Sequence, residues 1–304
     1  MTAKRKKKVN KIRVAFLLFC VAIPVINWLI FYVYCNFSAF TMAFTNGAGE
    51  FSFENFIRFW NEITNPDSTL ITAIKNTAIT FAILVVSFPF KVLVSYFIYK
   101  KIPGHNFQRI CFFLPGIIFG VAVSMVFSNM MSPRGFIAEW IGQWLNLDAP
   151  PELLADSRFA NYVIWGNMIW LGFPGDLIIW GGTFARIPEE TLESARIDGV
   201  TWWTEFTRII VPMVWPTVAL KMVLMICAIF TASGNVWLLT GGEYGTHTIS
   251  SWMYSMLLAN SGGSYRSNVY NYLSAIGLIM TIIALSLSFT VKKWTGKVFD
   301  EVEF

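Results

Sequence analysis

The sequence contains little charge for its length. Of its 304 residues, 13% are charged and 55% are hydrophobic, and the mean hydropathy is +0.55. Soluble domains carry roughly 25% charged residues, so this chain lacks the charge to cover a soluble globule of its size. Its 28 Phe, 13 Trp and 10 Tyr also exclude an intrinsically disordered chain. We therefore predict a polytopic membrane protein.

Residues that carry chemistry are also scarce. The two histidines, His105 and His247, lie far apart, so neither a metal site nor a Ser-His-Asp or Cys-His arrangement is expected. The four cysteines lie in apolar runs without paired spacing, which argues against a disulfide framework. The chain also lacks a Walker A sequence. We expect a protein that is not an enzyme, does not itself hydrolyse ATP, and binds no metal or cofactor.

Long apolar runs predict an all-α fold with six transmembrane helices. A helix needs about 20 mainly apolar residues to cross the hydrocarbon. The runs that meet this length are 14–35, 76–99, 110–131, 162–184, 216–239 and 270–291. Six spans place both termini on the same side of the membrane.

The distribution of basic residues predicts the orientation. Lys4-Arg5-Lys6-Lys7-Lys8 precedes the first span, and the tail 292–304 holds three more lysines. The first apolar run is too long for a signal peptide and lacks a cleavage site, so we interpret it as a retained helix. Cytoplasmic loops carry an excess of Lys and Arg, and this places both termini in the cytosol. The basic run is then a topology signal, and no nucleic-acid partner is expected.

Segment 187–216, between the fourth and fifth spans, predicts a pair of short helices in the cytosol. Pro188, followed by two glutamates, suits a helix start. Gly199 breaks this helix, and Thr201 can cap a second one.

The apolar side chains of this segment indicate a protein partner. Leu192, Ala195 and Ile197 offer apolar contacts on the first helix, and the second helix is rich in aromatic residues. We expect Pro212 and Pro216 to end the second helix before the next span. A connector this apolar is typical of a surface that contacts another protein.

The same segment resembles the EAA motif of the inner-membrane subunits of ATP-binding cassette (ABC) importers. Glu193-Ser194-Ala195 is followed after three residues by Gly199, and after nine more by Ile209-Ile210-Val211-Pro212. Ser194 and Val211 depart from the usual Ala and Leu. The resemblance implies a type I ABC importer permease fold in which this loop inserts into a groove of the ATPase subunit. The implied coupling residues are Glu193, Ser194, Ala195, Asp198, Gly199, Ile209 and Pro212.

Two further runs point to the carbohydrate branch of that family, the maltose-type permeases. They are Phe112-Phe113-Leu114-Pro115 and Leu238-Leu239-Thr240-Gly241-Gly242. The expected organisation is a basic tail (1–13), a first transmembrane helix with the start of an external loop (14–40), a core permease domain (70–291) and a cytosolic tail (292–304).

The resemblance also implies partners and location. It implies a bacterial plasma (inner) membrane protein that pairs with a second homologous permease subunit, two ATPase subunits and an external sugar-binding protein. ATP and Mg would then bind to the ATPase subunits and not to this chain. The alternative is a secondary transporter driven by an ion gradient, which would explain charges within the spans but not the EAA spacing.

Polar residues within the spans suggest a sugar path. Ser233-Gly234-Asn235 interrupts the fifth apolar run just before Trp237, and by resemblance this stretch lines the sugar cavity. Weaker candidates are Asn129, Asn167 and Trp170. The alternative is that these small and polar residues only hold helices together.

Three charged residues interrupt the spans. Lys91, Asp176 and Lys221 fall at similar depth in the cytosolic half of their spans. An ionisable group at such a depth is costly and is usually paired or faces water. We predict that Asp176 pairs with Lys221 or Lys91, whereas either lysine could instead extend to the cytosolic interface.

Overall fold

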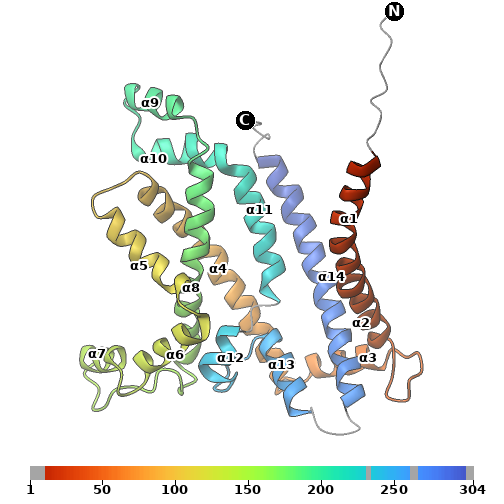
Figure 1. Cartoon of the computed structure of the whole chain (residues 1–304). Helices are drawn as coiled ribbons and strands as arrows, with labels where there is room; N and C mark the ends of the chain where they lie inside the picture. The colour runs from red at the N-terminus through yellow and green to blue at the C-terminus, as the bar shows by residue number, and fades with distance from the viewer. Residues whose placement is uncertain (1–10, 231–233, 261–265, 299–304) are drawn as a thin grey trace, which may run out of the picture. The chain divides into compact units, whose positions relative to one another are not determined.

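The computed structural model describes residues 11–230, 234–260 and 266–298, and these residues are almost entirely helical (Figure 1). The chain divides into two compact units. The first unit is Met1–Asn61 with Asn260–Ile279, and the second is Glu62–Ala259 with Met280–Phe304. The all-α fold class is confirmed, whereas the predicted core domain over residues 70–291 stays a prediction.

The first unit contains an apolar helix that is exposed along most of its length and contacts α3 (Glu54–Thr64) at its end, where Asn55 donates to the Ala43 carbonyl. Helix α1 (Lys11–Trp28) continues through a π-helical turn (Leu29–Tyr34) into α2 (Cys35–Ala43). Its span, Phe16–Ala43, has a hydropathy of 2.4 and none of its most apolar window is buried. The helix therefore runs past the predicted end at residue 35. The unit also contains most of α3 and the first part of α14 (Arg266–Val298), and the Arg58 guanidinium of α3 lies 4.0 Å from the ring centre of Tyr272 in α14.

The second unit holds the remaining helices. They are α4 (Thr69–Tyr99), α5 (His105–Ile117), α6 (Gly120–Met131), α7 (Phe136–Trp144), α8 (Ala160–Phe184), α9 (Glu189–Ile197), α10 (Trp202–Glu205), α11 (Val211–Ile229), α12 (Gly234–Thr240) and α13 (Ile249–Ala259). Within this unit α9 and α10 lie at one end, and α6, α7, α12 and α13 lie at the other (Figure 1). Helices α4, α8 and α11 run between the two ends.

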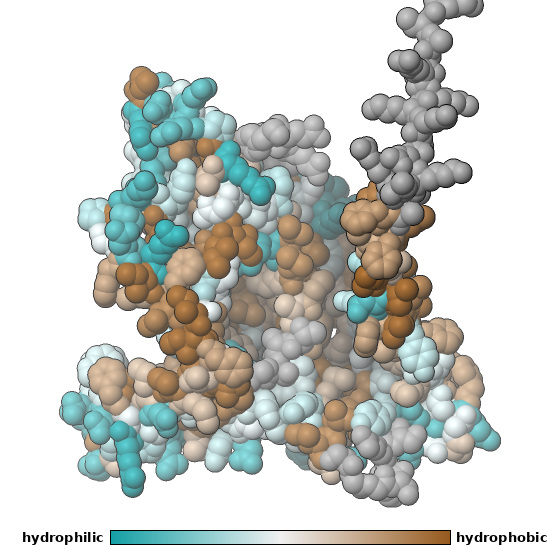
Figure 2. Space-filling model, viewed as in Figure 1, coloured by the Kyte–Doolittle hydropathy of each residue, from teal (hydrophilic) through white to brown (hydrophobic). Residues whose placement is uncertain are grey.

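Five helices of the described residues are long and apolar enough to cross a membrane, or six if one bent pair counts as a span. In the second unit, Figure 2 shows hydrophilic side chains at both ends, over α9 and over α7, with hydrophobic ones between. This band is the pattern expected of a bilayer-spanning bundle. The chain is a multi-pass membrane protein.

The third predicted span, 110–131, is wrong as a straight helix. Its two halves, His105–Ile117 and Gly120–Trp144, are bent by 111°. Pro115 lies near the end of α5, and Ile118 is extended (ψ 144°). Proline removes a backbone donor and disfavours continuation of the helix. At the same place a Cβ on Gly116 would overlap the Pro174 ring of α8, so close packing of α5 on α8 needs glycine there.

The fifth predicted span, 216–239, is also wrong at both ends. Helix α11 ends at Ile229, and α12 starts separately at Gly234. Pro212 and Pro216 do not end a preceding helix, because α10, a π-helical turn (Phe206–Ile210) and α11 form one continuous span over Trp202–Ile229. Proline lacks the donor that an α-helix needs, and the wider π turn just before Pro212 accommodates it within the first turn of α11.

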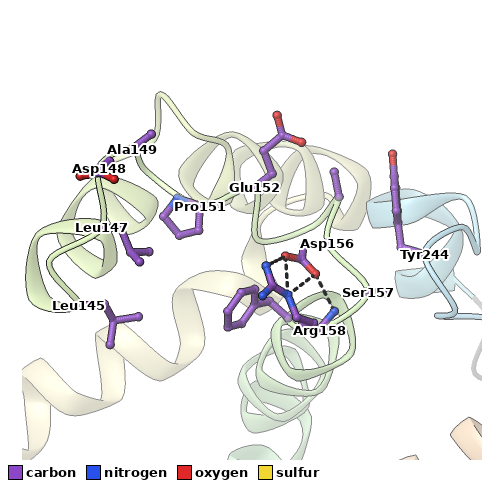
Figure 3. A pocket seen from close by; sticks show the side chains of 12 residues that line it. Leu145, Leu147, Asp148, Ala149, Pro151, Glu152, Asp156, Ser157, Arg158 and Tyr244 are labelled. Atoms are coloured by element: carbon purple, nitrogen blue, oxygen red, sulfur yellow. Dashed lines mark hydrogen bonds and ion pairs between the residues drawn. The ribbon is translucent and has the colours of Figure 1, made fainter.

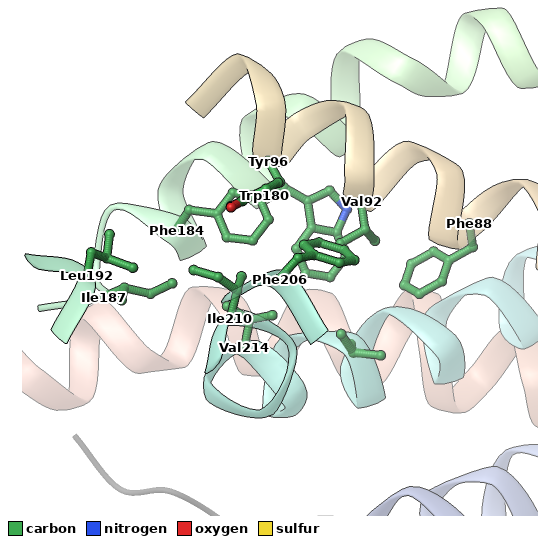
Figure 4. Close-up of a cluster of buried hydrophobic side chains, with 11 residues drawn as sticks. Phe88, Val92, Tyr96, Trp180, Phe184, Ile187, Leu192, Phe206, Ile210 and Val214 are labelled. Atoms are coloured by element: carbon green, nitrogen blue, oxygen red, sulfur yellow. The ribbon is translucent and has the colours of Figure 1, made fainter. Parts of the chain in front are cut away.

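A buried apolar cluster joins the α9–α10 end to the spans (Figure 4). It includes Tyr96 of α4, Trp180 and Phe184 of α8, Leu192 of α9, and Ile210 of the π turn. Figure 4 shows these side chains converging from separate elements. Fully burying an aliphatic or aromatic side chain contributes about 1.5–3 kcal/mol. The cluster therefore holds α9 and α10 firmly against α4 and α8.

Candidate coupling and translocation site

Helix α9 presents a charged face outward. Glu189 and Glu190 lie in its first turn, where acids favour the positive end of the helix dipole. Leu192 and Ala195 are buried against the apolar cluster. The implied coupling residues Glu193, Ser194 and Asp198 are exposed.

Ile197 does not make the expected packing contact. Its side chain is 86% exposed, more than that of any other large apolar residue among those described. It lies five residues after Leu192, which turns it well away from the buried face of the helix. The tip of α9 therefore carries an apolar side chain beside acidic ones.

Gly199 closes α9 in the way its sequence position suggests. Its φ is +68°, and nothing lies within 4 Å of where a Cβ would be. The Gly199 N–H donates to the Arg196 carbonyl at 3.1 Å, and the Val200 N–H donates to the Ala195 carbonyl at 3.1 Å. This is a Schellman turn, which uses glycine in the left-handed conformation.

Helix α10 is fixed by a cap and by a buried carboxylate. The Thr201 side chain accepts a hydrogen bond from the Thr204 N–H at 3.4 Å, as the sequence predicts. Glu205, which the sequence analysis missed, is buried. It accepts from the Tyr96 hydroxyl at 3.1 Å and forms an ion pair with Lys100 at 2.5 Å. These contacts tie α10 to the end of α4.

The other two residues implied for coupling lie where α10 passes into α11. Ile209 in the π turn and Pro212 in the first turn of α11 are both half-buried. They are therefore less exposed than Glu193, Ser194 and Asp198, and their role in coupling stays a prediction.

Asp176 of α8 contacts both lysines, where the sequence left the choice open. Its two carboxylate oxygens lie 3.2 Å from Lys91 Nζ and 2.6 Å from Lys221 Nζ. The side chains of Lys91, Asp176 and Lys221 are 7%, 11% and 21% exposed. The three residues come from α4, α8 and α11, so the ion pairs join three helices.

The residues suggested for a sugar path are partly brought together. The Asn235 side chain donates to Asn167 Oδ1 at 3.1 Å, linking α12 to α8. Asn167 is fully buried, and its own amide nitrogen has no hydrogen-bond partner among the described residues.

The remaining path candidates make other contacts. Trp170 stacks on Phe127 with ring centres 6.0 Å apart, and Trp237 packs edge-on against Tyr254 at 4.8 Å. Asn129 is exposed near the end of α6. The remaining candidate, Ser233, lies outside the described residues.

The opposite end of the second unit has an open pocket of about 710 Å³ that sequence reasoning did not identify (Figure 3). Figure 3 shows Asp156 paired with Arg158 near Glu152, with Tyr244 on a separate segment across the pocket. Hydrogen bonds from Arg158 lower the pKa of the Asp156 carboxyl. Nearby, burial lowers the pKa of His247. The loop that carries His247 is held to α4, because Asn76 donates to the Gly245 and His247 carbonyls at 2.6 and 2.9 Å.

Comparison with known proteins agrees with this architecture, although no family model matches the chain. The multiple sugar-binding transport system permease protein MsmF of Streptococcus mutans is 27% identical over 264 residues, covering 86% of this chain and 88% of the relative. The arabinooligosaccharides transport system permease protein AraP of Bacillus subtilis is 25% identical, and the match covers 90% of this chain and 86% of the relative. The fold is also similar to a chain in a solved structure, that of a bacterial alginate ABC transporter in complex with an alginate pentasaccharide-bound periplasmic protein. The TM-score is 0.79 and the sequence identity 22%, and the match covers 96% of this chain and 98% of that chain.

The fold is therefore that of an ABC importer permease, as the spacing around Gly199 predicts. The curated relatives are permease subunits of sugar transport systems, and this chain is similar to them over most of its length. None of the comparisons supports the secondary-transporter alternative.

Proposed function

We propose that the chain forms the translocation path and the coupling element of an ATP-driven importer of sugars or oligosaccharides. It lies in the bacterial inner membrane with both termini in the cytosol. The basic residues around the predicted cytosolic segments support this orientation, and so does the position of α9 and α10 at one end of the second unit. The relatives' names support a carbohydrate substrate.

The proposed assembly contains a second homologous permease subunit, two ATPase subunits and an external sugar-binding protein. The solved ABC transporter includes a periplasmic protein loaded with an oligosaccharide, which supports the external partner. The ATPase subunits bind ATP and Mg and carry out hydrolysis, and this chain binds no cofactor. The exposed acids and Ile197 of α9 supply a surface for the ATPase.

One observation carries the coupling mechanism: the docking end and the fifth span are one helix. Residues Trp202–Ile229 form a continuous rod, so Lys221 lies roughly 28 Å from Trp202 at 1.5 Å per residue. A displacement of α10 by the ATPase moves the rod as a lever. Glu205 ties the same lever to Lys100 at the end of α4, so both helices move together.

The far end of the helix Trp202–Ile229 lies next in sequence to the residues that we propose for the sugar path. Asn235 follows the end of α11 and bonds to Asn167 of α8. We assign this amide pair, with Trp170 and Trp237 nearby in sequence, to the sugar path, with Asn129 and Ser233 as further candidates. Amides suit sugar hydroxyls because they both donate and accept hydrogen bonds.

The test is the substitution Gly199→Asp in the assembled transporter. The position has open space around it, so the variant should fold and insert, with a backbone cost of about 1–2 kcal/mol for the left-handed conformation. An added carboxylate at the turn should abolish co-purification of the ATPase and ATP-dependent sugar uptake in proteoliposomes.

The matched control is Gly104→Asp. Gly104 has a φ of +84° and equally open surroundings, but it lies between α4 and α5. This variant should retain ATPase binding and uptake. Normal uptake by Gly199→Asp would contradict the proposed coupling role.

A further inference from the structure

A pocket of about 460 Å³ lies between α4, α8 and α11 in the second unit. Its described lining is apolar or glycine apart from three charged side chains: Lys91, Asp176 and Lys221. Gly172 belongs to the lining, and a Cβ there would overlap Lys91 Nζ, so the glycine makes room for the ammonium group. An apolar pocket of this size with a few convergent polar groups is the usual form of a small-molecule site.

The charges in this pocket do not balance. Two ammonium groups share the single carboxylate of Asp176, the one acidic side chain among the described residues that line the pocket. Each ammonium group has three N–H donors. The pocket therefore carries one uncompensated positive charge within the span region, where isolated charge is expensive.

Lys221 is the accessible member of the cluster. Its side chain is 21% exposed, against 7% for Lys91, whose ammonium also lies 5.6 Å from the ring centre of Phe173. Both lysines contact Asp176, and Lys221, although it is the closer of the two, is the more exposed cation that a molecule entering the pocket can reach.

We propose that this pocket binds a sugar carboxylate during translocation, with Lys221 as the direct contact. The inference rests on the proposed function and narrows its substrate class to acidic sugars of the uronic acid type. One excess positive charge matches one carboxylate, whereas a phosphate monoester brings up to two negative charges. The apolar walls, including Phe88 and Leu224, suit the less polar face of a sugar ring.

The experiment compares two disaccharides, digalacturonate and galactobiose. Each ring of digalacturonate carries a carboxylate where galactobiose carries a hydroxymethyl group, and the pocket takes one of these carboxylates at a time. The transporter is purified with its ATPase and permease partners in phosphatidylcholine nanodiscs, and dissociation constants are measured by calorimetry. Digalacturonate should bind at least ten times more tightly than galactobiose. Lys221→Gln should reduce this preference below threefold, and Lys221→Arg should preserve it.

Two controls separate the proposal from a purely structural role for the cluster. Lys101→Gln removes an exposed lysine between α4 and α5 and should leave the preference unchanged. Nanodiscs containing phosphatidylglycerol test whether a lipid headgroup takes the site instead. Loss of the digalacturonate preference in those nanodiscs would overturn the assignment to a sugar.

Equal binding of the two disaccharides by the unsubstituted protein would also overturn the proposal, as would a Lys221→Gln variant with unchanged preference. Either result would leave the proposed function standing if ATP-dependent uptake of neutral oligosaccharides is present. Absence of ATP-dependent uptake for both classes of sugar would instead contradict the proposed function.

Discussion

Glu205 and Lys100 are 105 positions apart in the chain, yet their side chains form an ion pair of 2.5 Å at the junction between α10 and α4. Glu205 is enclosed, with 4% of its side chain exposed, whereas 22% of Lys100 is exposed. The pair connects the proposed ATPase-docking element to a second span. It therefore bears on how motion passes from α10 into the bundle.

Glu205→Gln should loosen this connection while keeping the hydrogen bond from Tyr96. Removing one partner of a buried pair costs about 3–5 kcal/mol, and the partial exposure of Lys100 reduces this toward the lower end. We expect a lower thermal midpoint and a several-fold fall in sugar imported per ATP hydrolysed. In Glu205→Gln/Lys100→Met the midpoint should recover in part, and an unchanged transport-to-hydrolysis ratio in the single variant would contradict the coupling role.

Asp176→Asn should destabilise the second unit. It leaves two ammonium groups without their shared carboxylate, and an uncompensated buried charge costs about 3–5 kcal/mol. The expected result is a reduced yield of folded subunit and a lower thermal midpoint in detergent. Adding Lys221→Gln or Lys91→Met should restore part of the loss, and a wild-type midpoint for Asp176→Asn alone would refute the stabilising role of the cluster.

Ile197→Ser tests the exposed tip of α9. Ile197 is 86% exposed, so the substitution should leave subunit stability unchanged. If the residue enters the ATPase groove, lost burial of an isoleucine side chain should weaken ATPase binding by about 1.5–3 kcal/mol, or at least tenfold. The comparison is Leu192→Ala on the buried face of the same helix, which should lower subunit stability by about 2–5 kcal/mol. Unaltered ATPase affinity in Ile197→Ser would place the docking surface elsewhere.

Asn235→Ala tests the proposed sugar path. It removes the donor to the buried Asn167 oxygen, at a cost of about 1–3 kcal/mol. We expect sugar uptake to fall at least tenfold while the complete assembly still purifies. Asn129→Ala, at an exposed position, should have a smaller effect. Failure of the Asn235→Ala complex to assemble would show that the amide pair serves helix packing instead.

Local rules predicted the coupling segment well. Pro188, Gly199 and Thr201 each act through their own backbone and nearest neighbours, and the structure has a helix start, a Schellman turn and a cap at these residues. The outward position of Ile197 could also have been derived, because it lies off the helical face shared by Leu192 and Ala195. Composition showed which parts of the sequence are apolar enough to span a membrane. It did not show where the helices bend or end, because hydropathy does not detect the bend after Pro115 or the end of α11 at Ile229.

Long-range pairing was the harder part. The sequence shows that Asp176 needs a cation, but the choice between two lysines depends on how three helices pack, and both contact it. Glu205 gave no signal, because an acid in a short helix between two spans ordinarily faces water. Its partner Lys100 lies on another helix, and only the fold brings them together.

The π turn at Phe206–Ile210 determines in which direction around the helix axis each side chain of α11 points. A π turn acts as one residue inserted into an α-helix, and each residue turns the helix by roughly 100°. Deleting Thr207 would thus leave a continuous helix but would swing Lys221 by about that angle away from Asp176. The extra residue near the start of the continuous helix Trp202–Ile229 therefore aligns Lys221 with Asp176 within the bundle.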